Sequence, residues 1–284
     1  MTLDASTYKA WIGQKESSSD FLTLAPLRGL AATLNKVQLD YQPGDVLPPL
    51  WHWLYFLSPA RQSKLGNDGH AERGGFLPPI PLPRRMWAGS RFEFHRPLHA
   101  GEKISRVSTI KSINFKAGRS GQLAFVTVKH EISTELEKAI SEEHDIVYRD
   151  HVPADAAPAE PKQVEQEADY FKSINPDPVL LFRYSALTFN GHRIHYDRDY
   201  VTKVEGYPGL IVHGPLLATL LVDLLAEQFP EKSLQRFEFR AMNPVFDLNP
   251  FDVCGSNPDQ NGNLNLWIKD HNNALCMQAR ANIV

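Results

Sequence analysis

Polar and ionisable side chains crowd into one short segment of the chain. Residues 184–200 read YSALTFNGHRIHYDRDY, so that Asn190, His192, His195, Asp197 and Asp199 fall within ten positions. An imidazole with an ordinary pKa can accept and return a proton at neutral pH. If His195 faces a cavity, this segment is a candidate for general acid–base catalysis.

A backbone group at a predicted helix start is the second candidate. Residues 209–215 read GLIVHGP and lead directly into a Leu-rich run. The first N–H groups of a helix lack intrahelical partners and lie at the positive end of its dipole, so Gly214 could donate to a carbonyl oxygen like an oxyanion hole. A simple cap at Gly214-Pro215 and a structural role for His213 are the plainer alternatives.

Other kinds of site have less support. His192, His195 and Asp197 offer metal-ligand types, but their spacing matches no specific metal motif, and Asp197, Arg198 and Asp199 are typical of a solvated face. GxSxG, GxGxxG and Walker-type motifs are absent. We therefore expect neither a metal nor a cofactor.

Composition excludes several classes of protein. The 284 residues carry a formal charge of −3, with a pI near 6.4, so nucleic acid is not expected as a main partner. The two cysteines, Cys254 and Cys276, lie in strand-like runs and read as buried hydrophobes in a reducing compartment. No targeting segment is evident, and the longest apolar block, 216–225, is well short of the ~20 residues that span a bilayer. We expect a cytoplasmic protein without a membrane segment.

The elements that must position these residues form two halves. The Pro- and Ala-rich stretch 153–167 reads as a linker, which predicts an N-terminal half over 1–152, a linker over 153–168 and a C-terminal half over 169–284. In the first half, 50–57 (LWHWLYFL) reads as a buried helix, 66–83 as a loop and 122–132 as a strand of period two. In the second half, leucines at three- and four-residue steps predict a buried helix over 214–229, and strands are expected at 236–241, 251–254, 264–269 and 275–284.

A repeated tetrapeptide links the two halves. Arg-Phe-Glu-Phe occurs at 91–94 and again at 236–239, about half the chain apart. Together with the shared order of a helix followed by antiparallel strands, the repeat predicts an α+β protein. In this duplicated unit a long helix packs on a curved sheet in each half, and the sheets join side by side.

Two segments carry a resemblance to a known family. Residues 185–221, SALTFNGHRIHYDRDYVTKVEGYPGLIVHGPLLATLL, resemble the hydratase segment of MaoC-like enoyl-CoA hydratases and 3-hydroxyacyl-thioester dehydratases. The likeness is greatest to the branch that holds mesaconyl-C4-CoA and itaconyl-CoA hydratases and mitochondrial-type dehydratases. Residues 81–104, PLPRRMWAGSRFEFHRPLHAGEKI, are similar to the N-terminal half of that branch.

The resemblance implies a double hot-dog fold in which only the C-terminal half keeps the catalytic residues. The family's Asp and His, five residues apart, fall on Asn190 and His195, and its helix-opening His-Gly falls on His213 and Gly214. A carboxamide cannot exchange a proton, so His195 is expected to be the general base and acid. Asn190 is expected to position water, Gly214 to stabilise the enolate oxygen, and Asp197 or Tyr196 to orient His195.

The substrate implied by this branch is a short branched or dicarboxylic enoyl-CoA. A free carboxylate calls for an arginine, and the candidates by location are Arg84, Arg85, Arg193 and Arg198. The candidate substrate-binding residues are therefore His213, Tyr196, Arg193, Arg84 and Arg85.

The expected enzyme is a cofactor-independent hydro-lyase that converts itaconyl-CoA or mesaconyl-CoA to citramalyl-CoA. The alternatives are a 3-hydroxyacyl-thioester dehydratase of fatty-acid synthesis, an inactive acyl-CoA-binding module and a hot-dog thioesterase. Acyl-CoA is the expected partner, with neither nucleic acid nor membrane, and a homodimer is plausible. The acyl length, the direction of the reaction and the product stereochemistry stay open.

Overall fold

A computed structural model describes residues 5–72, 74–118, 121–150 and 160–284. Its centre is one ten-stranded antiparallel sheet with the order β1-β3-β4-β5-β2-β7-β10-β9-β8-β6. The strands are β1 (Lys15–Phe21), β2 (Arg84–Phe94), β3 (Lys103–Gly118), β4 (Gly121–Ser133), β5 (Lys138–Arg149), β6 (Tyr170–Ile174), β7 (Leu234–Ala241), β8 (Phe251–Gly255), β9 (Asn263–Lys269) and β10 (Leu275–Ile283).

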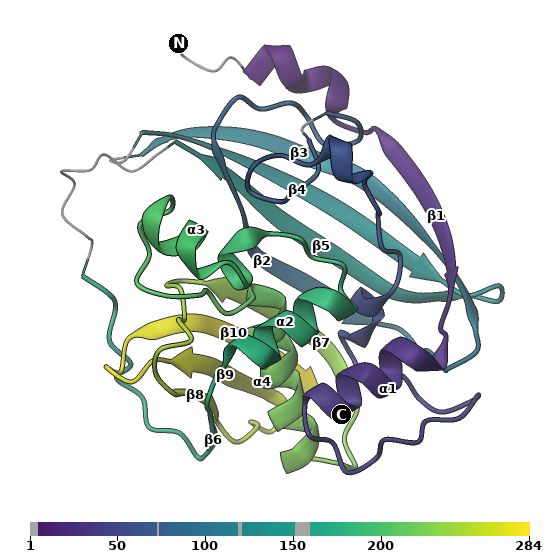
Figure 1. Ribbon diagram of the computed structural model, residues 1–284. Helices are drawn as coiled ribbons and strands as arrows, with labels where there is room; N and C mark the ends of the chain where they lie inside the picture. Colours follow the sequence, from purple (N-terminus) through teal and green to yellow (C-terminus); the bar gives the residue numbers. More distant parts are fainter. Residues whose placement is uncertain (1–4, 73, 119–120, 151–159) are drawn as a thin grey trace.

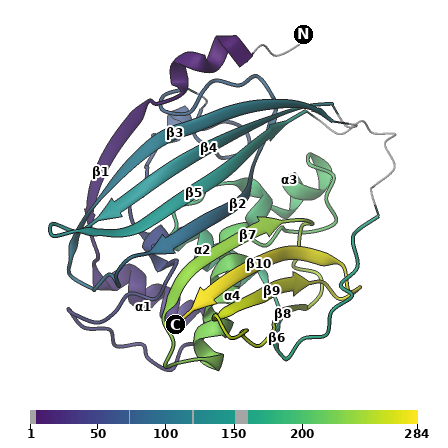
Figure 2. The same cartoon turned by 180° about the vertical axis from the view of Figure 1, so that it is seen from behind.

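The α-helices all lie on one side of this curved sheet, and the opposite side is bare of helices (Figures 1 and 2). They are α1 (Leu24–Thr33), α2 (Pro178–Leu187), α3 (Arg198–Lys203) and α4 (Gly214–Gln228). Short 3-10 helices are η1 (Ala5–Trp11), η2 (Trp51–Leu54), η3 (Gln62–Lys64) and η4 (Arg193–His195). The helices and the sheet enclose the main hydrophobic core.

The repeated tetrapeptide marks the seam between the two halves. It lies in β2 and β7, and these strands pair antiparallel so that the two copies face each other. Phe92 lies opposite Phe237, and Arg91 lies opposite Glu238. Aromatic and oppositely charged cross-strand pairs both stabilise a sheet. The two predicted half-sheets therefore join side by side into one.

The Leu-rich helix of the second half forms as predicted. Pro215 lies in the first turn of α4, where a missing backbone N–H costs nothing, and the residues from Leu216 to Leu225 are buried. The helix packs on β8 and β9. Its one buried acid, Asp223, is paired with Lys36 at 2.6 Å between Oδ2 and Nζ. Because α4 is buried along most of its length, the start of the helix, at His213 and Gly214, is held in a fixed position.

The predicted helix over residues 50–57 is wrong. Only the four residues of η2 are helical, and of these Trp51, His52 and Leu54 are buried as expected. Leu50 and Phe56 take positive φ values of 70° and 56°, and prolines stand on both sides of the run. A left-handed residue at each end stops helix propagation. The first half therefore has no long helix over β3 and β4, and loops cover these strands instead (Figure 1).

Most other structural expectations are confirmed. The predicted strand at 122–132 lies in β4, with Ala124, Val126, Val128 and Ile132 buried, and the four predicted C-terminal strands correspond to β7–β10. Cys254 and Cys276 are free and buried. Within the described residues, no helix is long and apolar enough to cross a membrane.

The division into two halves and a linker stays a prediction. Residues 151–159 of the linker lie outside the described residues. Residues 160–169 contain no helix or strand, although Gln163 forms a bridge with Ala274.

Candidate active site

His195 ends the short helix η4 and lies beside the start of α4. Its side chain is 7% exposed, and its Nδ1 is 2.7 Å from the carbonyl oxygen of Ile211. A carbonyl can only accept, so Nδ1 carries the proton and Nε2 carries the lone pair. Burial lowers the pKa of His195 to about 4, even though the bond to Ile211 favours the charged form. The ring is therefore a neutral base at neutral pH.

His213, the N-cap of α4, holds this ring from one side. The imidazoles of His195 and His213 stack with 3.6 Å between their centroids, and Nε2 of His213 is 2.8 Å from Oγ of Ser185. Burial, and then the neighbouring histidines, hold the pKa of His213 well below its usual value. His213 therefore contacts and positions the base.

Gly214 is the first residue of α4 and follows His213 directly. Its backbone N–H has no partner within the helix and lies at the positive end of the 15-residue helix dipole. A Cβ built on Gly214 would meet nothing within 4 Å, so there is open space beside the residue. A proton-transfer group and a backbone donor thus stand side by side.

Asn190 holds the loop that carries the histidines. Its Oδ1 accepts from the backbone N–H of His192 at 3.0 Å, and its own N–H donates to the carbonyl of Ser185 at 2.8 Å. The amide NH2 and the second lone pair of Oδ1 remain for a water molecule, and they can orient that water but cannot take its proton. The water-positioning role of Asn190 stays a prediction.

Asp197 and Tyr196, which were expected to orient His195, bind other partners. Asp197 accepts from the N–H of Tyr200 at the start of α3 and pairs with Arg193 at 2.7 Å. The Tyr196 hydroxyl donates to the carbonyl of Gly191 at 3.0 Å, and the residue is 46% exposed. The expectation that either residue orients His195 is therefore wrong, because the Ile211 carbonyl holds the Nδ1 proton.

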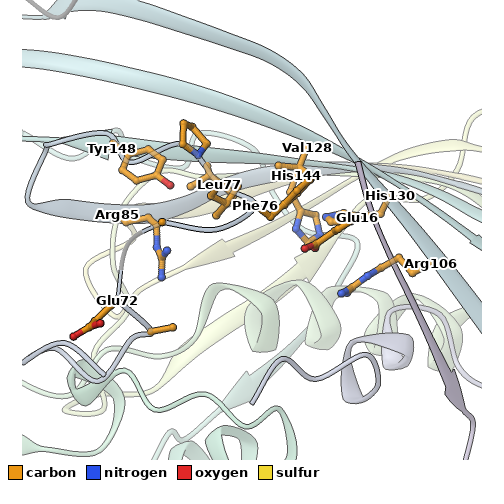
Figure 3. Close-up of a pocket in the computed structure, with 14 residues that line it drawn as sticks. Glu16, Glu72, Phe76, Leu77, Arg85, Arg106, Val128, His130, His144 and Tyr148 are labelled. Atoms are coloured by element: carbon orange, nitrogen blue, oxygen red, sulfur yellow. The ribbon is translucent and has the colours of Figure 1, made fainter. Parts of the chain in front are cut away.

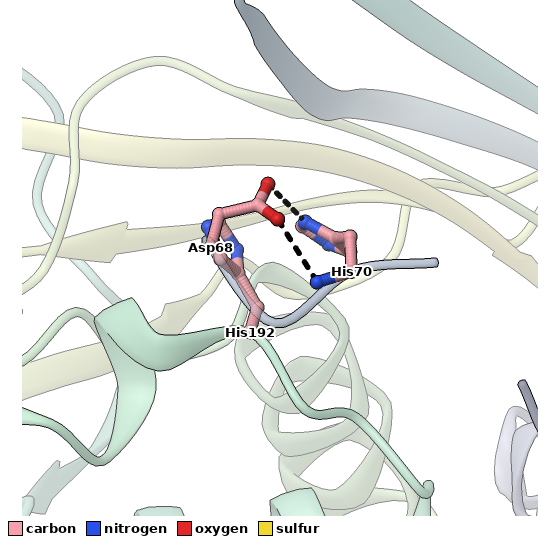
Figure 4. A group of neighbouring side chains, drawn as sticks. All are labelled: Asp68, His70 and His192. Carbon is pink, nitrogen blue, oxygen red and sulfur yellow. Dashed lines mark hydrogen bonds and ion pairs between the residues drawn. The ribbon is translucent and has the colours of Figure 1, made fainter. Parts of the chain in front are cut away.

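A loop from the first half reaches this segment, which the sequence did not predict. Figure 4 shows Asp68 and His70 beside His192; both oxygens of Asp68 accept from His70, at 3.0 Å from its N and 2.9 Å from its Nδ1. The rings of His70 and His192 lie 4.0 Å apart, and the His192 ring meets that of His195 edge-on at 5.5 Å. The bond from His70 holds the pKa of Asp68 well below its usual value, while burial lowers that of His192 to about 2.

This loop also contains the group best suited to a metal ion. Ligand atoms of Asp68, His70 and His192 lie within 4.8 Å of one another, and nitrogen and oxygen ligands suit several divalent metals. His70, however, already occupies both carboxylate oxygens of Asp68. The trio suggested by the sequence, His192, His195 and Asp197, is not such a group among the described residues, because Asp197 turns to Arg193.

The four candidate arginines differ in their partners. Arg84 pairs with Glu205 at 3.2 Å, Arg193 pairs with Asp197 and lies 4.2 Å over the Tyr200 ring, and Arg198 pairs with the buried Asp247. Arg85 forms no ion pair or side-chain hydrogen bond within the described part of the chain, and its side chain lines a cavity.

That cavity, of about 330 Å³, lies under the sheet of the first half, where the expected long helix is missing (Figure 3). Arg85, Arg106, His130 and His144 all line it. A second cavity of about 180 Å³ shares the last three of these residues and extends to Thr188, two residues before Asn190. The second space therefore reaches toward the histidine segment, although neither cavity is lined by His195, His213 or Gly214.

The sequence analysis missed Arg106, His130 and His144. One signal was available: His130 falls on the same face of its strand as Ala124, Val126 and Val128, so it interrupts an otherwise apolar face. A polar residue on a core-facing strand position is a reason to expect a cavity or a buried partner. Here Nδ1 of His130 bonds the hydroxyl of Ser108 at 2.9 Å.

Comparison with known proteins decides the family. Residues 50–247 match the family model described as hydroxyacyl-thioester dehydratase type 2. The chain belongs to this family. It is a hydro-lyase of the MaoC-like group, which confirms the resemblance seen in the sequence. It is 49% identical over 252 residues to the mesaconyl-C4-CoA hydratase of Chloroflexus aurantiacus, covering 88% of this chain and 89% of the relative.

Solved structures confirm the fold of this family member. A MaoC-like dehydratase from Phytophthora capsici superposes with a TM-score of 0.72 at 14% identity, over 99% of each chain. A Mycobacterium tuberculosis protein described as a double hot-dog superposes with a TM-score of 0.60 at 13% identity, over 96% of each chain. The predicted double hot-dog architecture is therefore correct, with the first-half helix as the exception.

Proposed function

We propose that this hydro-lyase adds water across the C=C bond of a short dicarboxylic enoyl-CoA, with mesaconyl-C4-CoA as the first candidate and itaconyl-CoA as the second. The observation that carries the reaction type is the neutral His195 beside the N–H of Gly214, which has no partner within α4. The substrate class rests on the hydratase that shares 49% identity with the chain.

The first half of the reaction uses both groups. Nε2 of His195 takes a proton from water while the water oxygen bonds to Cβ of the substrate. In mesaconyl-C4-CoA, whose C=C bond is conjugated with the thioester, the electrons of that bond move toward the thioester carbonyl, and its oxygen becomes the enolate oxygen. The N–H of Gly214 donates to that oxygen, and one such donor is typically worth about 2.7–4 kcal/mol.

The second half returns the proton. The enolate collapses, Cα takes the proton from the His195 imidazolium, and the product is a 3-hydroxyacyl-CoA. The depressed pKa of His195 suits this step, because the buried imidazolium readily gives up its proton. Asn190 can hold the water by its amide N–H but takes no proton. The proposed reaction needs no metal and no cofactor.

The connected cavities favour a short polar acyl group over a long chain. A fatty acyl chain needs an apolar tunnel, whereas here Arg85, Arg106, His130 and His144 stand among the apolar side chains of the wall, such as Phe76, Leu77 and Val128. Dehydration of a 3-hydroxyacyl thioester is the same chemistry in reverse, and the family model takes its name from that direction. It is therefore the second candidate function.

The test incubates the purified protein separately with mesaconyl-C4-CoA, itaconyl-CoA, crotonyl-CoA and a long-chain 2-enoyl-CoA. Products are separated by mass, and free thiol is followed in parallel. Water gain by a C5 diacid thioester is the expected result. Preference for the long chain would support the dehydratase, thiol release a thioesterase, and binding without any turnover an inactive acyl-CoA module.

The setting of this activity follows from the same proposal. Acyl-CoA is the partner, and neither nucleic acid nor a membrane is needed for a reaction on a free thioester. A cytoplasmic homodimer fits a folded enzyme of this size, since C2 dimers are the commonest assemblies. Light scattering of the purified protein tests the dimer.

A further inference from the structure

We propose that Arg85 binds the free carboxylate of the substrate and, with Arg106 behind it, makes the enzyme selective for dicarboxylic acyl groups. This inference rests on the proposed hydratase function. In mesaconyl-C4-CoA the free carboxylate is bonded to Cβ, the same carbon that water attacks. A cation that binds it must therefore lie next to the catalytic histidine, not at the far end of a long pocket.

Three of the four arginines near the two motifs are already engaged. Arg84, Arg193 and Arg198 each pair with a carboxylate of the protein. Such an arginine would have to give up its partner in order to bind a substrate anion. Arg85 is half-buried, makes no ion pair among the described residues and lines the cavity.

Arg85 also lies close to the histidine segment. After burial and the neighbouring histidines, the charge of Arg85 is one of the influences that lower the pKa of His192. The His192 ring in turn meets the His195 ring edge-on. Arg85 therefore lines the cavity of the first half and is near enough to the histidine segment for its charge to act on His192.

Arg106 supplies a second positive charge in the same cavity. Figure 3 shows the guanidinium groups of Arg85 and Arg106 pointing to the same side of the sheet. The Nε of Arg106 is buried without a hydrogen-bond partner. Among the described residues, the only hydrogen bond of the Arg106 side chain is a long one of 3.4 Å from Nη2 to the carbonyl of Phe56. Arg106 is half-buried, and a guanidinium with donors left over in such a place is a candidate for anion binding.

Acidic residues near the cavity offset the charge of Arg106 more than that of Arg85. Glu142 is buried, and although burial opposes its charge, His144, His52 and the indole N–H of Trp53 bind its carboxylate and hold its pKa well below the usual value. Glu16 on β1 also lines the cavity, and Glu16 and Glu142 are the two acidic groups whose charges act on Arg106, whereas Glu72 pairs with Lys64. Arg85 is therefore the cation of the cavity that has no acidic partner among the described residues.

The chemistry of the step adds a reason for a cation at this place. A carboxylate on Cβ repels the oxygen of the attacking water as that oxygen gains hydroxide character. A bidentate guanidinium on the carboxylate reduces this repulsion and also fixes the orientation of the double bond. Loss of Arg85 should therefore affect kcat as well as KM for a diacid, and should spare a neutral substrate.

The experiment compares mesaconyl-C4-CoA with crotonyl-CoA, which has no free carboxylate. We expect Arg85→Gln to lower kcat/KM for the diacid by roughly 10- to 150-fold, the range for a hydrogen bond to a charged group, and to change the value for crotonyl-CoA less than threefold. Arg85→Lys keeps the charge without the fork and should fall in between. Arg106→Gln should reduce diacid turnover less than Arg85→Gln does.

The control is Arg280→Gln, which removes a highly exposed arginine on β10. It should leave both substrates unchanged, and circular dichroism should show that every variant is folded. Equal losses for both substrates in Arg85→Gln, or no loss for the diacid, would overturn the inference while the hydratase function stood. A wild-type protein that hydrates crotonyl-CoA but not the diacid would overturn the substrate class and this inference together.

Discussion

The imidazoles of His195 and His213 stack with 3.6 Å between their centroids and 18° between their planes. Two charged rings at this separation in a buried site would repel strongly, and burial lowers the pKa of both. The stack is therefore a pair of neutral rings. The Ile211 carbonyl holds the Nδ1 proton of His195 and so leaves the lone pair on Nε2, as the proposed role of a base requires.

Replacement of His195 by Gln should remove proton transfer and leave the fold intact. Positioned acid–base groups contribute about 10²–10⁴-fold to rates, so we expect kcat for the best substrate to fall within that range. KM should change little. The control is His271→Gln at an exposed histidine, which should keep full activity. Turnover within a few-fold of wild type in His195→Gln would contradict its role.

The pH dependence of kcat/KM should report the depressed pKa of His195. The base works only when it is neutral, and its pKa is about 4, so activity should stay flat from pH 8 down to about 5 and fall by half near pH 4. Stopped assays over this range, with circular dichroism at each pH, provide the measurement. A half-point near 6.5 would show instead an ordinary, solvated histidine.

A methyl group at Gly214 should harm catalysis without harming stability. An added Cβ meets nothing within 4 Å, and Gly214 has no positive φ, so alanine fits the first turn of α4. The methyl would occupy the space through which the thioester oxygen approaches the N–H. We expect Gly214→Ala to keep the wild-type melting temperature and to lose roughly 10- to 100-fold in kcat/KM, since an oxyanion donor is typically worth about 10²–10³-fold. Full activity would place the thioester elsewhere.

The contact between the two halves at the site can be tested with two glycines of one loop. Gly69 and Gly75 have nearly the same φ, +87° and +88°. A Cβ on Gly69 would lie 1.9 Å from the carbonyl oxygen of Gly191, whereas one on Gly75 would meet nothing within 4 Å. Both alanine variants carry the same backbone strain, so only the collision differs.

Gly69→Ala should therefore push the loop of Asp68 and His70 away from the histidine segment. A displacement of about 1 Å can cost up to about 10²-fold in rate, so we expect kcat/KM to fall at least tenfold below that of Gly75→Ala. Melting temperatures of the two variants provide the check on folding. Equal activities would show that the loop does not position His192 and His195.

The sequence predicted the elements whose signals are local. The period of the leucines predicted α4, the alternation of apolar residues predicted β4, and the repeated tetrapeptide indicated the duplication; that the two copies pair at the seam, with Phe92 opposite Phe237, is known only from the structure. The prediction of a helix at 50–57 was wrong because of two local backbone conformations that cannot be read from the amino-acid composition. Leu50 and Phe56 take left-handed conformations, which the apolar character of this segment does not predict.

The site was predictable only where its residues are neighbours in the sequence. His195, His213 and Gly214 could be found because one segment and one helix start carry them. Asp68 reaches the same place from another half of the chain; the backbone of Arg193 donates to its carbonyl at 2.9 Å. The sequence could name Arg85 as one of four candidate arginines for the substrate carboxylate. It could not select Arg85 among them, because the selection depends on which arginines already pair with acidic residues in the folded protein.

The buried histidines should make the fold sensitive to mild acid. The folded-state pKa values of His130 and His192 are about 3 and about 2, mainly because of burial, and that of His195 is about 4. An unfolded histidine has a pKa near 6.5, so below that pH the unfolded chain binds more protons than the folded one. Stability is then full above about pH 6.5 and falls as the pH drops toward the folded values, by up to roughly 1.4 kcal/mol per pH unit for each histidine.

Urea unfolding at pH 7 and pH 5 measures this loss as a shift of the midpoint to lower urea. His130→Gln removes one of these histidines, which include His213 as well, while keeping a partner for the Ser108 hydroxyl, so its midpoint should depend less steeply on pH than that of wild type. The exposed His271→Gln should follow the wild-type dependence. If the His130→Gln dependence is as steep as wild type, His130 is not buried in its neutral form, and the polar wall of the cavity is more open to water than the structure shows.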